Sequence, residues 1–558
     1  MARPEAKARA GSTAPDTITE PATASIAPAR PASPAAARRA PLPAARRRTG
    51  LTLGAWLFAA AALFLCYLRI SRTVPANSDG AANALQAWDM LHGNLLLHGW
   101  WLSDVSFYTT ELPQYMLVEL VHGLNSDVVH VAAAATYTLL VLLAALLAKG
   151  RTTGREAVIR MLVAVGIMLA PQPGTGAGIL LLSPDHVGST VPVLLVWLLL
   201  DRARQRWYVP VLVGALLTWA LVADKIILIT GVLPLIVICA IRAYHGIVQL
   251  RQPVRARWYE LSLAGAAVVA GEISAQILAL INQAGGFHLW PVISTFAVSA
   301  EIPRHFAFTA HGLLVLFGAD FFGHRLGLRA ALLLLHVAGL VLALVAVCVG
   351  LRRFTRIDLV SQLALAGVLT SLIAYLLGQR VSDINSTREF AAVLPFSAVL
   401  AGRLLPPMLA KARMVPALSL VLAGYLASLG VAVATPSVPP MGQRLTTWLT
   451  EHHLRYGLGA YWQANIVSLT SSERVMVVPV SVNDAGAVVH DQWESKASWY
   501  DPRQHDANFV VQLRLPSPLP AFLPRSALQA AFGPPAKIYT FGPYTILVWH
   551  KNLLTQLD

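Results

Sequence analysis

Long apolar runs separated by short polar connections dominate most of the chain. The first run covers residues 51–70 and matches the roughly 20 apolar residues that a membrane-spanning helix needs. Ten more runs follow, and we predict a span in each: 128–148, 157–170, 187–200, 208–223, 226–242, 260–283, 329–350, 358–378, 390–405 and 413–434. Several are short, so their helices must extend into the connections. The pattern predicts about eleven spans, and the short runs at 157–170 and 390–405 leave ten or twelve open.

The pattern changes after residue 434. A helical stretch is predicted near 441–454, and strand-like runs follow at 475–482, 508–515 and 544–551. We therefore predict a soluble α/β domain over residues 436–558, about the usual size of a small domain. It contains no cysteine, so we expect its own core to hold it together.

Charge in the connections predicts the orientation. Five connections hold three or more Lys or Arg residues each: 149–156, 201–206, 242–257, 351–356 and 403–413. The connections between them hold few or none. By the positive-inside rule, the N-terminus is cytoplasmic and the C-terminal domain extracytoplasmic. The apolar segment 306–322 is predicted to be interfacial or re-entrant, because a twelfth crossing would break this alternation.

Composition narrows the class of protein. Hydrophobic residues make up 56% of the 558 residues and charged residues only 13%, against about a quarter in ordinary soluble domains. This is typical of a multi-pass protein of the cell membrane with the lipid bilayer as its partner. The net charge of +15 lies in short clusters, which disfavours nucleic-acid binding. Residues 1–50 are predicted to be a disordered basic cytoplasmic tail, because they lack apolar periodicity.

Two long outer loops, 71–127 and 284–328, are the expected places for chemistry. In the first, Asp79 precedes an amphipathic stretch, so it is either a general base at the membrane surface or, like Ser78, only a helix cap. Glu111 precedes Pro113 and could equally begin a helix. We find no GxxxxGK, HExxH or GxSxG motif, so ATPase, zincin and serine-hydrolase functions lack support.

The layout and three segments resemble the GT-C superfamily of membrane glycosyltransferases, in particular its protein O-mannosyltransferase and aminoarabinose-transferase branch. The segments are SDG (78–80), TTELPQY (109–115) and INSTREFAAVLPF (384–396). The resemblance implies GT-C-like architecture and transfer of a sugar from a polyprenyl-phosphate-linked donor outside the cytoplasm. It also implies that Asp79 is the catalytic base and that Glu111 matches a second acidic position. Gly80 follows Asp79, so the paired acids of the mannosyltransferases are missing at this point.

Such a reaction needs positive charge on the departing phosphate. Four outer side chains could supply it: Lys225, Arg388, Arg304 and His305. Lys225 could instead point to water from a turn, and Arg388 could be a snorkelling interfacial arginine. A divalent metal is possible, since His186 beside an acid could help to hold one, but no ligand spacing defines a metal site, and no cofactor is indicated.

Further side chains could contact the sugar or the acceptor: Asp185, His186, Tyr461 and Trp462. His186 could equally be structural, and the aromatic pair could form an interface against the membrane. The predicted function is glycosyl transfer to a hydroxyl of a cell-envelope glycan, lipid or protein, with Asp79 as the base. The alternatives are a transporter or flippase of lipid-linked precursors, for which Glu272 within a deep apolar run would matter most, and a non-catalytic membrane scaffold.

Overall fold

The computed structural model describes residues 44–411, 413–514 and 523–557, and the chain divides into two compact units, 1–55 and 56–558. The first unit is described only from Ala44, where helix α1 (Ala44–Ser71) begins. Residues 1–43 of the predicted tail lie outside the described residues. Residues 44–50 are helical, so the predicted disordered tail is too long at this end. The local sequence AARRR suits a helix, because Ala and Arg are good helix formers.

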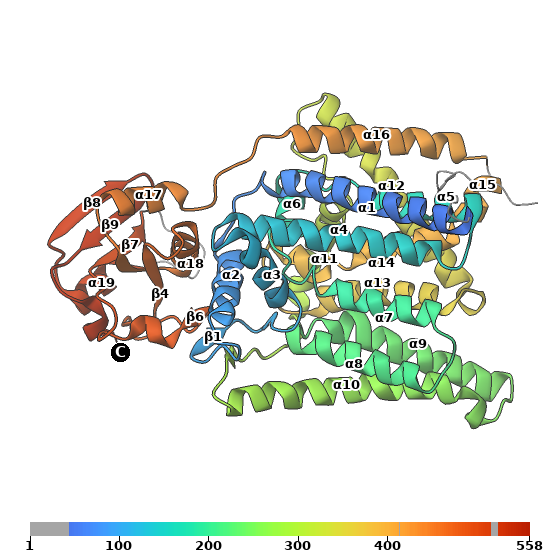
Figure 1. Cartoon of the computed structure of the whole chain (residues 1–558), viewed down its shortest axis with the longest axis horizontal. Helices are drawn as coiled ribbons and strands as arrows, with labels where there is room; N and C mark the ends of the chain where they lie inside the picture. The colour runs from blue at the N-terminus through green and yellow to red at the C-terminus, as the bar shows by residue number, and fades with distance from the viewer. Residues whose placement is uncertain (1–43, 412, 515–522, 558) are drawn as a thin grey trace, which may run out of the picture. The chain divides into compact units, whose positions relative to one another are not determined.

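Each of the eleven predicted spans corresponds to a helix in the structure (Figure 1). The helices are α1, α4 (Asp127–Lys149), α5 (Gly154–Met168), α7 (Thr190–Arg202), α8 (Tyr208–Ala223), α9 (Leu233–Tyr244), α10 (Trp258–Gln283), α12 (Leu328–Arg352), α13 (Leu359–Leu377), α14 (Val393–Leu404) and α16 (Val415–Ala434). Two π-helical turns flank α9, namely η1 (Leu228–Val232) and η2 (His245–Gln249).

Within the described ranges, seven helices are long and apolar enough to cross a membrane, as expected of a polytopic membrane protein. They cover Leu53–Ser71, Asp127–Lys149, Leu228–Gln249, Val254–Gln283, Leu328–Arg352, Leu359–Leu377 and Val415–Ala434. The other four, α5, α7, α8 and α14, have 12 to 16 residues. At about 1.5 Å per residue they are shorter than the hydrocarbon core. The count of eleven spans therefore stays a prediction.

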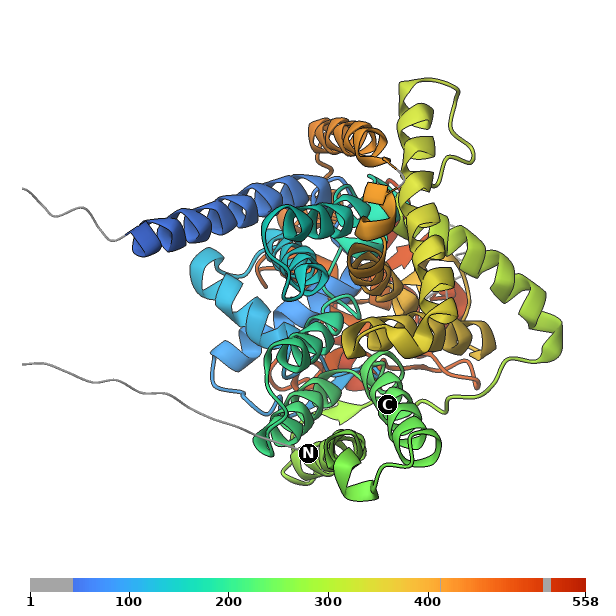
Figure 2. The same ribbon diagram turned by 90° about the vertical axis from the view of Figure 1, so that its right-hand side faces the viewer.

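Helix α14 lies at the centre of the bundle and packs against α4, α5, α12 and α13. Figure 2 shows the same bundle turned by 90° about the vertical axis. All its residues from Val393 to Arg403 are buried. Gly402 lets the neighbours approach, because a Cβ there would lie 2.7 Å from the Cβ of Ala148. Close packing of this kind is how helices associate within a membrane.

Short elements fill the ends of the bundle. These are α6 (Thr175–Leu180), η3 (Val254–Arg257), η4 (Ser299–Glu301), α11 (Ile302–Leu316), η5 (Phe354–Arg356), η6 (Ile384–Phe390) and α15 (Pro406–Lys411). Helix α11 covers much of the apolar segment 306–322 and packs on α13 and η6. Its interfacial or re-entrant position stays a prediction.

The first long loop is folded. It holds α2 (Ser78–Leu91), β1 (Trp100–Leu102) and α3 (Glu111–His122), as the amphipathic stretch and the start at Glu111 predicted. The predicted cap is wrong in detail, because the side chain of Asn77, not of Ser78 or Asp79, accepts the hydrogen bond from the Gly80 N–H. Strand β1 pairs in parallel with β2 (His288–Leu289) of the second long loop. It also pairs with β6 (Ser495–Lys496) of the C-terminal region.

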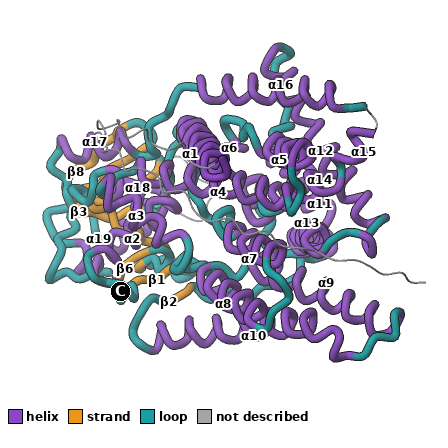
Figure 3. Tube along the Cα trace, turned by 45° about the vertical axis from the view of Figure 1, so that its right-hand side comes forward, coloured by secondary structure: helices purple, strands orange, loops and turns teal. Residues whose placement is uncertain are grey.

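The C-terminal region is an α/β structure, and its strands lie on one side of the helices (Figure 3). Its helices are α17 (Gln443–Glu451), α18 (Tyr461–Thr470) and α19 (Arg525–Phe532), with η7 (Ala497–Tyr500) and η8 (Leu553–Gln556). The six-stranded sheet has the order β5-β4-β3-β7-β9-β8 and is parallel only at β4-β3-β7. Its strands are β3 (Tyr456–Gly459), β4 (Met476–Val482), β5 (Val488–His490), β7 (Phe509–Leu513), β8 (Lys537–Phe541) and β9 (Tyr544–Val548). Strands β4, β7 and β9 lie within the three predicted strand-like runs.

The core of this region continues into the first long loop. Buried residues of α18 and the sheet, such as Leu458 and Ile466, belong to one cluster with Ala84 of α2 and Leu112 of α3. A smaller cluster around Leu449 and Phe509 lies within the region itself. The expectation that the C-terminal domain is held by its own core alone is therefore incomplete. This shared core fixes α18 against α2, and both helices contribute to the site described next.

Candidate functional site

A cavity of about 550 Å³ opens where the first turn of α2, helix α6, the segment 380–389 and the start of α18 meet. Its polar lining comes from Asn77, Asp79, Arg380, Ser382, Asp383, Asn385, Ser386, Arg388, Glu389 and Gln463. Its apolar lining includes Ile179, Leu182, Met441, Trp462 and Leu513. A cavity of this size with a few convergent charged groups is the usual form of a small-molecule site.

Asp79 and Arg388, which the sequence analysis singled out separately, meet at the wall of this cavity, and Tyr461, singled out as well, contacts Asp79 without lining the cavity. The Asp79 Oδ2 atom lies 3.2 Å from Arg388 Nη1, and the Tyr461 hydroxyl donates a 2.7 Å hydrogen bond to Asp79 Oδ1. The Asp79 side chain is 19% exposed and the Arg388 side chain 41% exposed, so both can reach a ligand. The site therefore offers a carboxylate, a guanidinium and a phenol within one hydrogen-bonded group.

The elements around these side chains explain their positions. Asp79 lies in the first turn of α2, where the positive end of the helix dipole favours a carboxylate. Arg388 lies in η6, whose start is capped by Asp383 accepting a hydrogen bond from the Asn385 N–H. Burial opposes the charge on Arg388, but the carboxylates of Asp79 and Asp185 outweigh it and raise the Arg388 pKa. Arg388 thus remains a cation at the site.

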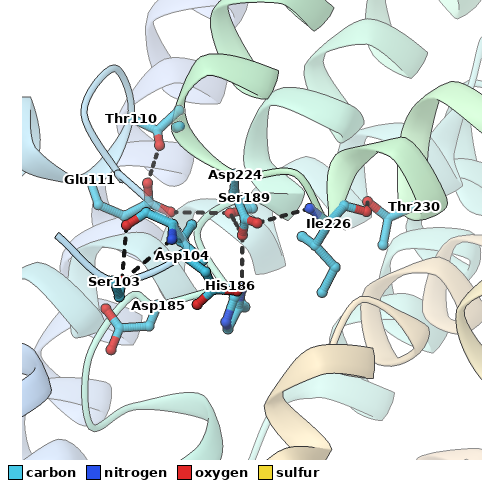
Figure 4. Close-up of polar contacts among 12 residues, drawn as sticks. Ser103, Asp104, Thr110, Glu111, Asp185, His186, Ser189, Asp224, Ile226 and Thr230 are labelled. Carbon is cyan, nitrogen blue, oxygen red and sulfur yellow. Dashed lines mark hydrogen bonds and ion pairs between the residues drawn. The ribbon is translucent and has the colours of Figure 1, made fainter. Parts of the chain in front are cut away.

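A cluster of polar groups lies beside the cavity, and Glu111, Ser189 and Asp224 in it are buried. Figure 4 shows the contacts among these side chains. The His186 Nδ1 atom lies 2.9 Å from Asp224 Oδ2, which also accepts a 2.6 Å hydrogen bond from the Ser189 hydroxyl. Glu111 accepts a hydrogen bond from the Thr110 hydroxyl, and its Oε1 atom lies 3.5 Å from the Ser189 hydroxyl oxygen. In Figure 4, Glu111 lies to the left of the Asp224 carboxylate and His186 lies below it.

The two acids of this cluster differ in protonation, because the pKa of Glu111 is raised and the pKa of Asp224 is lowered. Burial raises the pKa of Glu111 to about 8, assisted by the nearby Asp224 and Asp185 carboxylates. Burial disfavours a charged His186, but the Asp224 carboxylate outweighs this and raises the His186 pKa to about 9. His186 in turn lowers the Asp224 pKa, against the effect of burial. At neutral pH the cluster therefore holds an ion pair beside a neutral Glu111 carboxyl.

A second cavity of about 190 Å³ adjoins the first. Arg380 and Glu389 line both cavities, and Lys225, His186 and Asp224 line the second. Lys225 is exposed, and no acidic partner pairs with it among the described residues. Arg380 forms an ion pair with Asp104. Basic side chains thus line both cavities, with Arg388 and Arg380 each paired to an acid.

The structure does not bring every predicted residue to the main cavity. Arg304 donates to the carbonyl of Ser382 at its rim, and its guanidinium lies 5.3 Å from the ring centre of Phe308. His305 is buried, and its Nδ1 pairs with the Leu376 carbonyl, so it lines neither cavity. Its predicted phosphate contact therefore does not fit this packing of α11 on α13.

Asp185 and Glu111 lie behind the cavity wall. Asp185 accepts hydrogen bonds from Asn83 at 2.8 Å and from Ser183 at 2.5 Å. Burial, followed by the nearby Asp79 carboxylate, raises the Asp185 pKa. Both acids are more than nine-tenths buried and line neither cavity. Direct contact of Asp185 with a sugar, or of Glu111 with a reacting atom, therefore does not fit their positions. Trp462, by contrast, lines the main cavity with its ring next to Tyr461.

The sequence analysis missed Arg380, Glu389 and Glu494. Arg380 lies just before the INSTREF segment (384–390), and Glu389 lies within it, next to Arg388. Glu494 accepts hydrogen bonds from the Ser103 N–H at 3.0 Å and from the Gln86 amide. Burial raises the Glu494 pKa to about 7. It ties the C-terminal region to α2 close to Asp79, and no local pattern in the sequence marks it.

Among the described residues, no group of three or more His, Cys, Asp or Glu side chains is placed to hold a metal ion. At the main cavity, Asp79 pairs with Arg388 rather than with another acid. No protein-family model matches the chain, and no curated protein matches it either.

Proposed function

We propose that the chain is a membrane glycosyltransferase that takes a sugar from a polyprenyl-phosphate-linked donor and transfers it to an extracytoplasmic hydroxyl. The acceptor class is a cell-envelope glycan, lipid or protein. The observation that carries this proposal is the Asp79–Arg388 pair at the wall of the 550 Å³ cavity, with Tyr461 on the other carboxylate oxygen. The GT-C resemblance of the SDG and INSTREF segments supports it, because both segments contribute to this one site.

The proposed reaction is a single displacement. The acceptor hydroxyl attacks the anomeric carbon, and Asp79 accepts its proton. The bond from that carbon to the phosphate oxygen breaks, and the phosphate leaves with the electron pair. The configuration at the anomeric carbon is therefore inverted. Arg388 stabilises the charge that grows on this oxygen.

The ion pair suggests how donor binding prepares the base. In the free protein, Asp79 and Arg388 neutralise each other at 3.2 Å. A donor phosphate in the cavity competes for the half-exposed guanidinium, because Arg binds phosphate as well as carboxylate. Asp79 then faces the acceptor without its cation, while Tyr461 keeps it oriented. A base freed only when the donor is present also protects the donor from premature attack.

Two alternatives are weaker. A transporter would place its membrane-embedded charge on a path through the bundle, but Glu272 is on the exposed side of α10. A scaffold would not need a solvent-reachable Asp–Arg pair at the wall of a large cavity. Nucleic acid is not a proposed partner, and no metal is assigned a step.

The test compares cell-envelope glycans and polyprenyl-linked sugars by mass spectrometry. A deletion strain is complemented with the native protein, with Asp79→Asn or with Asp127→Asn at equal membrane abundance. Asp127 is the matched control, because it also pairs with an arginine, Arg72, at 2.6 Å but lines neither cavity. We expect the deletion to remove a sugar and accumulate a lipid-linked precursor, and only Asp127→Asn to restore the native pattern. Full restoration by Asp79→Asn would reject the catalytic assignment.

A further inference from the structure

A third cavity lies where α9 connects to α10. Figure 1 shows this connection at the end of the bundle away from the C-terminal sheet. The cavity measures about 160 Å³ and is lined by Ile241, Arg242, His245, Arg257, Phe354, Thr355 and Gln362. These residues come from α9, η2, η3, η5 and α13, so the cavity is built by packing rather than by one loop. It is separate from the Asp79 site and does not depend on the function proposed for that site.

The cavity carries positive charge that the described residues do not balance. Arg242 donates a 2.9 Å hydrogen bond to the neutral amide of Gln362. Arg257 contacts one acid, Glu260, at 3.2 Å. Two arginines and one glutamate leave one positive charge before His245 is counted. A monovalent anion would balance it.

The Arg257 guanidinium has one hydrogen-bond donor without a partner among the described residues. Its Nε is buried and has no hydrogen-bond partner among the described residues. A buried unpaired donor is costly, and a bound anion would satisfy it. Its guanidinium lies directly over Gly246, where a Cβ would come within 2.0 Å of Arg257 Nε. The glycine therefore makes room for this arginine.

The surroundings favour a lipid over a free ion. Exposed apolar side chains lie along the same α9–α10 connection as the cavity-lining residues His245 and Arg257, namely Tyr244, Val248, Leu250, Val254 and Trp258. Aromatic side chains at a helix end are typical of the membrane interface. This connection is also one of the basic ones that the positive-inside rule places in the cytoplasm, beside anionic lipids.

We propose that this cavity, formed by Arg242, His245, Arg257 and Thr355, binds the phosphate of an anionic phospholipid headgroup. The two guanidinium groups and the Thr355 hydroxyl donate hydrogen bonds to the phosphate oxygens. The flanking apolar side chains contact the acyl chains. A free phosphate ion would satisfy the same donors but would gain nothing from the apolar rim.

The test uses the full-length protein, purified in a neutral detergent and stripped of lipid. Native mass spectrometry then measures retention of phosphatidylglycerol, with neutral diacylglycerol and inorganic phosphate as separate ligands. We expect Arg242→Gln combined with Arg257→Gln to weaken phosphatidylglycerol binding about tenfold or more, because two charge-assisted contacts are lost. The matched control combines Arg251→Gln with Arg255→Gln. It removes the same charge from exposed positions of the same connection that do not line the cavity.

A second variant keeps every charge. Gly246→Ala displaces the Arg257 guanidinium, so it should weaken binding severalfold while the control pair stays near the native value. Equal losses in the cavity variants and the control would show unspecific attraction to a basic connection and reject the site. Inorganic phosphate that binds as tightly as phosphatidylglycerol would reject the lipid. If the double variant fails to fold, Gly246→Ala decides alone.

Discussion

The bundle contains Asp–Arg clusters at both of its ends, and they are built differently. Near the C-terminal region, Asp79 and Arg388 are 19% and 41% exposed at the wall of a large cavity. At the opposite end of α14, Arg403 contacts Asp201 at 2.7 Å and Asp358 at 3.3 Å, and the Arg403 and Asp201 side chains are only 7% and 6% exposed. The chemistry is the same, but only the first pair can meet a ligand.

The buried Arg403–Asp201 pair stabilises the fold, whereas the Asp79–Arg388 pair is accessible to a ligand. Arg403 Nη1 also donates a 2.6 Å hydrogen bond to the Leu147 carbonyl, and the guanidinium lies over Gly150 between α4 and α14. It joins elements that are distant in the chain. The side chains of Asp79 and Arg388 are instead partly exposed at the wall of the main cavity, where they can form further hydrogen bonds. Perturbed or paired charges facing a cleft are typical of functional sites.

The largest effect is expected when one partner of the buried pair is removed. Asp201→Asn leaves the Arg403 guanidinium with only the half-exposed Asp358 carboxylate as its partner, so we expect a loss of at most about 3–5 kcal/mol in the free energy of unfolding. This loss is measured by unfolding the protein in mixed detergents and monitoring the transition by circular dichroism. Asp127→Asn breaks a pair about one-third exposed and should cost at most about 1 kcal/mol. Equal losses would contradict the division between the two ends.

The converse prediction concerns rate. Arg388→Gln removes the cation that would stabilise the departing phosphate, and we expect transfer to slow by about 10²–10³-fold. The measurement is sugar transfer in membranes containing equal amounts of folded protein. Arg72→Gln breaks the Asp127 pair outside both cavities and should leave the rate unchanged. A slow Arg72→Gln variant would mean that outer charge, rather than the site, controls transfer.

A smaller effect is expected where Tyr461 of the C-terminal region contacts Asp79 of α2. Tyr461→Phe removes one hydrogen bond to the Asp79 carboxylate, and such bonds are worth about 1.5–3 kcal/mol, so transfer should fall by about tenfold or more. Tyr456→Phe is the control, because its hydroxyl also donates a 2.7 Å hydrogen bond, but to the Trp499 carbonyl away from the cavity. If both variants lose rate equally, Tyr461 acts only through folding of the C-terminal region.

The sequence predicted the helices well and the site only in part. Apolar runs mark helices directly, because each run must bury or cover its own surface. Asp79 could be singled out because it follows the first run and begins an amphipathic helix. Its contacts with Arg388 and Tyr461 cross 309 and 382 residues of chain, and no local pattern encodes such distances.

His305 and Glu494 were not assigned correctly from the sequence, because tertiary packing decides where their side chains lie. Nothing near His305 in sequence indicates that α11 buries it against α13. Glu494 likewise becomes part of the site only through the paired strands β1 and β6 and the core shared with α2. Side chains brought together by tertiary packing can be predicted only once that packing is known.

The pH dependence of stability gives the finest comparison. Burial raises the Glu111 pKa to about 8, against an ordinary value near 4.5 in the unfolded chain. The folded protein thus holds this proton while the unfolded chain releases it. Stability from Glu111 is complete below about pH 4.5 and is lost progressively up to about pH 8.

Glu111→Gln keeps the neutral shape and removes the titration. We therefore expect its free energy of unfolding, relative to the native protein, to rise by about 1.4 kcal/mol per pH unit between pH 5 and pH 7. Unfolding at pH 5, 6 and 7 measures the difference. The difference also cancels the contributions of Glu494 and His186, which both proteins retain. Glu451→Gln, at an exposed position of α17, should show no such trend. A constant difference for Glu111→Gln would mean that this carboxyl is already ionised in the folded protein and acts at the site as a charge.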